Sequence, residues 1–366
     1  MYEIIDTRIS KDFSKTAYNI IKKSDVKKKL LSELFNGRVE DSYYWCAELI
    51  CSDNFILLWE IIIEFVCKDI YIANPKLIHF IHQKYCIFKN IIIDTENSIE
   101  LRNNNTIRHI FLEIISICCF SNKESMIDLS KLSIPKFDIH TFSNYLTADN
   151  IKYIEPFFFD DDPKELYLFL NEIIFNISNK NIILTLQWLL WIIEYSTIRK
   201  KNKDPIICHK RFDFDLGNNT VNLHPIWIIW DILFKLSSKT TYNIYTDNII
   251  DSLFNLYKFQ LNESKIKSRI YIVIFAVKIL FLNDIHFNIP VLDNKEVNIE
   301  NIKTYKSNID RVYKKIDDSF KLSIKNDPEI LSFISENNIK EKTQNVKIKN
   351  KESNKKMMIL ENFLNK

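Results

Sequence analysis

Apolar residues recur every three or four positions along most of the chain, and short polar segments interrupt the pattern. The pattern is clearest in residues 40–81, where it has the period of helices that bury a broad face. The polar segment 52–54 breaks the chain after the first helix, and Asn74 followed by Pro75 opens the third, with Asn as its cap. This stretch therefore predicts three helices joined by short turns.

The same reasoning predicts helices through the rest of the chain. Residues 26–35 form a helix that stops at Asn36 and Gly37, a pair suited to a left-handed cap. Asp162 followed by Pro163 is the clearest helix start, with Asp as the N-cap. Further helices are predicted at residues 11–23, 75–90, 106–119, 165–178, 182–200, 246–259, 264–282, 299–324 and 328–336, from His224 onward, and as a short element near 140–146.

These elements predict an all-α fold. Most connections are short, as between antiparallel helical neighbours, and no repeat of fixed length is found. We therefore expect an irregular multi-helix array with two lobes, residues 1–120 and 161–339, joined by a connector at 121–160. Polar and apolar residues alternate near residues 205–222, around Gly217, which predicts a small hairpin.

Composition excludes several classes of protein. Only two glycines are present, Gly37 and Gly217, and they lie far apart. A P-loop, a Rossmann dinucleotide site and a Gly-x-Ser-x-Gly nucleophile elbow each need glycines close together, so all three are excluded. Cys208, His209 and His224 could supply three zinc ligands, but no fourth ligand stands at a recognised spacing. We predict no metal, cofactor or catalytic centre.

The expected environment is intracellular. The seven cysteines lie mostly within apolar helical patterns, and the start, MYEIIDTRISKDFSK, lacks the apolar core of a secretory signal. We expect reduced cysteines that act as small hydrophobic residues. Glu60, Glu64 and Lys278 interrupt the most apolar helices, so no membrane contact is predicted.

Basic residues supply one set of candidate contacts. The net charge is only +3, but lysines and arginines cluster near residues 27–29, near 199–201 and in the basic tail at 340–366. Such clusters would bind the phosphates of a nucleic acid if they converged in space, and solvated helix ends are the alternative. The tail is expected to be disordered, and to be either a docking peptide or a solvated end.

Tryptophans supply the other set. Pairs spaced by three residues, with two further tryptophans, suit either base stacking or a packed core and interface. The candidate interaction residues are Trp45, Trp59, Lys27, Lys28, Lys29, Arg199, Lys200, Lys201, Lys355 and Lys356.

Residues 20–85 carry a resemblance to a known family. Ser24-Asp25, Tyr44-Trp45 and Ala73-Asn74-Pro75 follow in order, with Ala47 and Asp69-Ile70 between them. They resemble the helical collar region that follows the ATPase module in the Werner-helicase-interacting-protein family of AAA+ clamp-loader relatives. Three features depart from that family: Cys67-Lys68 replaces its Ser-Glu, Tyr71 stands where it has glycine, and the ATPase module is missing.

The whole chain, including WCAELICS, looks more like an uncharacterised helical protein family of nucleocytoplasmic large DNA viruses. That resemblance implies a viral protein of the host cytoplasm or viral factory. By analogy with the collar, it implies an accessory of DNA replication or repair that oligomerises through these helices.

We therefore expect a non-catalytic protein-interaction or assembly factor of viral DNA replication or repair. It would self-associate or bind a protein partner, and nucleic acid through its basic clusters and tail. A structural or virion-associated scaffold and an enzyme with a dispersed site are the alternatives. Basic clusters on one face would favour the first, an exposed apolar patch the second, and a deep pocket with perturbed carboxylates or histidines the third.

Overall fold

A computed structural model describes residues 2–326 apart from residues 7, 96, 133–142, 239–243, 283 and 293–295. The described chain is all-α, as predicted, and its β-structure is limited to one isolated bridge between Thr16 and Lys22. The chain forms two compact units. Of the described residues, those up to Glu124 and those from Ile289 onward form unit 1, and those within Ser125–Asn288 form unit 2.

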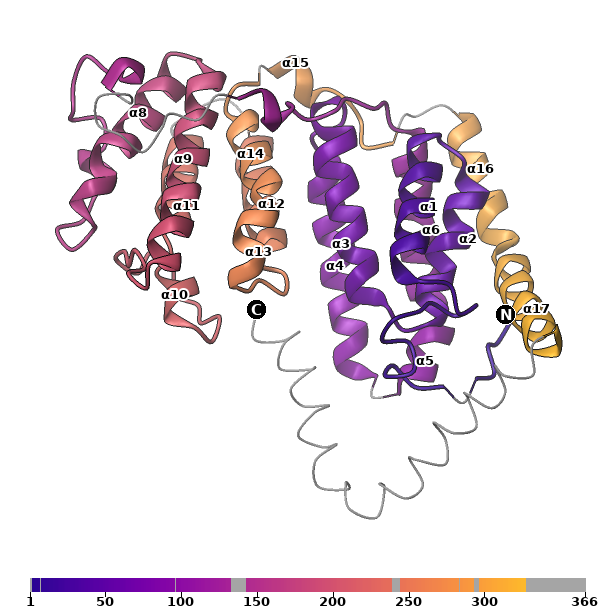
Figure 1. The fold of residues 1–366 in the computed structure, drawn as a ribbon. Helices are drawn as coiled ribbons and strands as arrows, with labels where there is room; N and C mark the ends of the chain where they lie inside the picture. Colours follow the sequence, from indigo (N-terminus) through magenta and orange to yellow (C-terminus); the bar gives the residue numbers. More distant parts are fainter. Residues whose placement is uncertain are drawn as a thin grey trace. The chain divides into compact units, whose positions relative to one another are not determined.

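Unit 1 is a helical bundle arranged around α2, which contacts α1, α3, α5, α6 and α17 and is buried along most of its length. Figure 1 shows α16 and α17, in orange and yellow, beside the purple helices of the first part of the chain. The helices of unit 1 are α1 (Lys23–Phe35), α2 (Val39–Cys51), α3 (Phe55–Phe65), α4 (Leu77–Asp94), α5 (Ser98–Asn103), α6 (Asn105–Phe120), α16 (Glu296–Ser307) and α17 (Ile309–Asn326).

Local signals set both ends of α2. Gly37 ends the preceding helix at φ +71°, and a Cβ added there would lie 3.3 Å from the Cys119 carbonyl oxygen. Any other residue at position 37 would be strained, because its backbone angle would be unfavourable and its Cβ would crowd this oxygen. Glu40 and Asp41 follow in the first turn, where their charges favour the positive end of the helix dipole. Asp53, at φ +56°, separates α2 from α3 as the sequence predicts.

The chain between α3 and α4 is tightly wound but not α-helical. A π-helical turn, η1 (Val66–Ile70), runs into a 3₁₀ turn, η2 (Tyr71–Ala73), and Tyr71 has φ +48°. The predicted cap at Asn74 is wrong, because its side-chain amide donates to Ser121 Oγ at 3.2 Å and to the Val291 carbonyl oxygen at 2.9 Å. Asn74 thus joins three segments of unit 1 instead of capping α4.

The last described helices belong to unit 1, which differs from the predicted lobe at 161–339. The apolar stripe of α17 packs on α2, and α16 packs on α6. The Arg108 guanidinium lies 3.7 Å from the centre of the Tyr313 ring. The predicted helix at 299–324 is divided at Asn308 into α16 and α17. An amphipathic pattern predicts that a helix is buried, but not which partner covers it.

The helix predicted at residues 11–23 is wrong. Residues 2–22 form an irregular segment that buried arginines hold against the bundle. Arg102 donates to the Arg8 carbonyl oxygen at 2.8 Å, and Arg108 donates to the Tyr2 carbonyl oxygen at 2.7 Å. Within the predicted helix itself, the Tyr18 carbonyl oxygen accepts from the Arg8 guanidinium at 2.8 Å, so a charged donor satisfies a backbone acceptor that a helix would have paired internally.

Unit 2 has a core of aromatic and aliphatic side chains. Its helices are α8 (Tyr167–Ser178), α9 (Ile182–Lys201), α10 (Asn219–Asn222), α11 (Ile226–Ser237), α12 (Ile244–Lys258), α13 (Glu263–Ser268), α14 (Ile270–Ile279) and α15 (Asp284–Phe287), with 3₁₀ turns η3 (Leu129–Lys131), η4 (Ser143–Tyr145), η5 (Glu155–Phe157) and η6 (Lys164–Leu166). The hairpin predicted near 205–222 is wrong, because this segment is irregular and ends in α10. The helix predicted at 264–282 is divided into α13 and α14 at Arg269.

Some predictions fall outside the described residues. These are the helix at 328–336, the basic tail at 340–366 and residues 140–142 of the short element near 140–146, whose described part contains η4. In the part of the chain that is described, no helix is both long and apolar enough to cross a membrane.

Candidate functional site

The tryptophans predicted as interaction residues differ in exposure. Trp59 is fully buried and packs against Phe88 and Phe111, with ring centres 5.4 and 5.0 Å away, which places it in the core of unit 1. Trp45 is half-buried, with its ring edge-on to Tyr44 at 5.2 Å. The tryptophan pairs of α9 and α11 are also buried. Of these rings, Trp45 is the one that remains accessible to a partner.

Acidic neighbours pair with three of the six predicted basic contacts that the structure describes. In unit 1, Lys27 lies 2.6 Å from Glu64, whereas Lys28 and Lys29 are exposed. In unit 2, Arg199 pairs with Glu165 and Asp204, and Lys200 lies 2.8 Å from Glu263, whereas Lys201 is exposed. Lys355 and Lys356 lie outside the described residues. Pairing of this kind leaves fewer cations for phosphates.

A buried ion pair in unit 2 was missed at the sequence level. Asp162 does not cap the following helix. It accepts the backbone N–H groups of Phe159 at 2.9 Å and His209 at 3.0 Å and pairs with Arg211. The side chains of this pair are 0% and 1% exposed. The two residues are 49 positions apart, so no local pattern connects them.

The candidate zinc ligands do not form a metal site in the described chain. No group of three or more His, Cys, Asp or Glu side chains is placed to hold a metal among the described residues. Cys208 is buried, and burial raises the pKa of its thiol. His209 binds Asp161 through Nδ1 at 2.8 Å.

His224 lines a hollow of about 270 Å³ in unit 2. Its Nδ1 accepts the Ile226 backbone N–H at 3.0 Å, so the neutral ring carries its proton on Nε2. Burial lowers the pKa of His224 to about 4, an effect that the Glu263 carboxylate opposes and Lys200 reinforces. If the chain had the dispersed enzyme site of the third alternative, the neutral His224 imidazole beside the Glu263 carboxylate would be its general base.

The strongest candidate for an interaction site is a depression in unit 1 between the start of α2 and the junction of α16 with α17, here called the α2/α17 hollow. Its volume is about 250 Å³. Its floor is apolar and fixed: Val39, Leu112 and the Tyr43 ring are buried. The Tyr43 hydroxyl donates to the Arg108 carbonyl oxygen at 3.0 Å and lies 3.1 Å from the Tyr313 hydroxyl.

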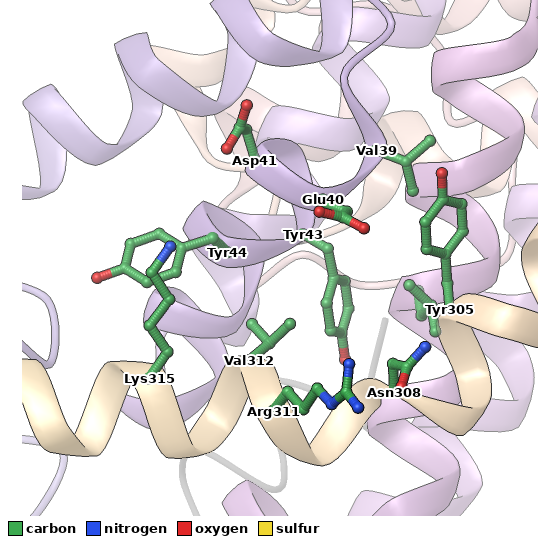
Figure 2. A pocket seen from close by; sticks show the side chains of 11 residues that line it. Val39, Glu40, Asp41, Tyr43, Tyr44, Tyr305, Asn308, Arg311, Val312 and Lys315 are labelled. Carbon is green, nitrogen blue, oxygen red and sulfur yellow. The ribbon is translucent and has the colours of Figure 1, made fainter.

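Opposite charges form the two walls of the α2/α17 hollow. Glu40 and Asp41 stand on α2, and Arg311 and Lys315 stand one turn apart on α17, as Figure 2 shows. These four side chains are exposed, and no ion pair joins the two walls in the described structure. The Lys315 ammonium instead lies 5.2 Å from the centre of the Tyr44 ring.

Tyr305 completes the rim from α16. Burial raises the pKa of its phenol, and the nearby Glu40 carboxylate raises it further. The phenol is therefore neutral at physiological pH and can donate a hydrogen bond. An apolar floor between unpaired charges of both signs suits recognition of a protein surface that carries both charges.

Sequence reasoning missed this arrangement because its walls come from segments about 270 residues apart. No local signal marks Arg311, because it lies in the middle of the predicted helix at 299–324 and comes into the first turn of α17 only through the division at Asn308. No protein-family model, curated protein or solved structure matches the chain.

Proposed function

We propose that the protein is an interaction and assembly module that self-associates or binds a protein partner, and that it serves as an accessory of viral DNA replication or repair. The observation that carries the proposal is the α2/α17 hollow, with its fixed apolar floor and its unpaired charges on opposite walls. Such a surface provides complementarity to a polypeptide without any chemistry of its own.

The conformation of Tyr71 supports the resemblance to a clamp-loader collar. Tyr71 has φ +48° and stands where the resembling family has glycine. Positive φ is a conformation that glycine adopts without strain and other residues seldom adopt. The segment that contains it joins α3 to α4.

Pairing of the basic residues limits how nucleic acid would be bound. The exposed lysines Lys28, Lys29 and Lys201 are the folded residues proposed for phosphate contacts, together with Lys355 and Lys356 of the tail. A few exposed lysines predict weak binding that falls steeply as salt concentration rises.

Two measurements test the proposal. Sedimentation velocity of the full chain at increasing concentration should reveal self-association. Titration of labelled single-stranded and duplex DNA at several salt concentrations should show binding by the full chain that weakens in a variant ending at Ile339. A monomer that binds neither DNA nor a protein partner would refute the proposed accessory role.

The same measurements separate the proposal from the alternative of a structural or virion-associated scaffold. A scaffold would self-associate into large assemblies without affinity for DNA at any salt concentration. An accessory would form a small, defined oligomer and bind DNA at low salt.

A further inference from the structure

We infer that two copies of the chain dock face to face through the α2/α17 hollow, with the acidic wall of each copy against the basic wall of the other. The inference rests on the self-association proposed above and names the surface that mediates it. It starts from the charge arrangement of the hollow, which carries two acids on one wall and two bases on the other.

Twofold symmetry makes this arrangement self-complementary. In a symmetric dimer the same patch meets itself, so that residue i of one copy contacts residue j of the other and j contacts i. An axis that runs along the hollow, between its walls, brings Glu40 and Asp41 of one copy opposite Arg311 and Lys315 of its partner. The second pair of walls meets in the same way. Charges unpaired within one copy are thus paired between copies.

A large apolar side chain close in sequence to the hollow is exposed. Phe35 is 54% exposed at the end of α1, although it is a large apolar residue. It precedes Val39 of the hollow floor by four residues, which places their Cα atoms within about 14 Å. Contact with the partner copy around the facing hollows would bury part of this exposed ring, as interfaces do with aromatic side chains near their centre.

Charge reversal tests the pairing of the walls. One variant carries Glu40→Lys and Asp41→Lys, and the other carries Arg311→Glu and Lys315→Glu. Each variant faces itself with like charges, so its dimer dissociation constant should rise by roughly tenfold or more relative to the unaltered chain. An equimolar mixture of the two variants should recover the unaltered affinity, because both wall contacts are then attractive. Recovery also shows that both variants are folded.

Matched controls separate the surface from general charge effects. Lys11→Glu with Lys15→Glu changes net charge by the same amount on exposed residues of unit 1 that have no proposed contact, and should leave self-association unchanged. Phe35→Ser should weaken it, and Ile87→Ser, at a residue 45% exposed on α4, should not.

Sedimentation equilibrium on these variants gives a clear decision. If the unaltered chain self-associates and the reversal variants do so equally well, or their mixture does not recover, the inferred surface is wrong and the proposed self-association stands. If the unaltered chain is monomeric at every concentration, both the surface and self-association are wrong. Loss in each variant with recovery in the mixture supports the face-to-face dimer.

Discussion

Removing one charge from the buried pair Asp162–Arg211 should destabilise unit 2 strongly. In Asp162→Asn the guanidinium stays buried, with Asp231 3.6 Å away and the Phe159 ring 4.3 Å away. Breaking a buried ion pair generally costs about 3–5 kcal/mol, because one charge is left in a medium of low polarity. These two neighbours compensate in part, so we expect about 3 kcal/mol, a large share of a typical stability of about 5–15 kcal/mol.

Urea unfolding followed by circular dichroism and tryptophan fluorescence measures this loss. The matched control is Glu263→Gln in the same unit, which breaks the exposed pair with Lys200, where the side chains are 30% and 53% exposed. An exposed pair contributes about 0–1 kcal/mol. The double variant Asp162→Asn with Arg211→Met should be less destabilised than the sum of its two single changes, because no buried charge remains. If Asp162→Asn lowers stability no more than Glu263→Gln does, the buried ion pair does not stabilise unit 2.

Three further changes are expected to have measurable effects. Burial raises the pKa of Asp317, but hydrogen bonds from Lys321 and two tyrosines outweigh burial and leave the pKa below the usual 3.8. The ionised Asp317 carboxylate therefore stabilises the fold above pH 3.8, and this stabilisation is lost as the pH falls further. Asp317→Asn should flatten the fall in thermal stability between pH 4 and about pH 2. The pKa of His224 is lowered from 6.5 to about 4, so the unfolded chain binds the proton at a higher pH than the folded chain and stability falls as the pH drops from 6.5 to 4. His224→Gln should reduce the difference in free energy of unfolding between pH 7 and 4.5 by about 2 kcal/mol in urea titrations. Ile20 has φ +63° at 36% exposure, so Ile20→Gly should raise stability by roughly 0.5–1 kcal/mol in thermal melts, whereas Ile87→Gly within α4 should lower it by about 1 kcal/mol.

The sequence predicts the elements of this fold where the determining interactions are local. The helix at residues 26–35 and its stop at Gly37 follow from periodicity and from a backbone angle that favours glycine. The break at residues 52–54 follows from polar residues between two apolar stripes. In each case the relevant partners lie within one or two helical turns.

Predictions are wrong where a side chain that suits a local role is used over a long distance. Asn74 and Asp162 both have sequences typical of caps, yet their polar groups bond to segments that lie 47 residues or more away in the chain. Residues 11–23 have a helical pattern, but the Tyr18 carbonyl oxygen accepts from the Arg8 guanidinium and the Tyr18 hydroxyl donates to Asp317, 299 residues away. The two walls of the α2/α17 hollow meet for the same reason, through packing that no local pattern encodes.

The insertion of unit 2 into unit 1 has a consequence for synthesis of the chain. Helices α1 to α6 leave the ribosome first, but α16 and α17, which cover α2 and α6, follow only after residues 125–288. The chain is synthesised at about 5–20 residues per second, so the apolar faces of α2 and α6 stay uncovered for roughly 10–40 s before these helices are made. During that interval unit 2 can fold as one continuous stretch, whereas the first part of unit 1 stays open to chaperones and to other nascent copies of the chain.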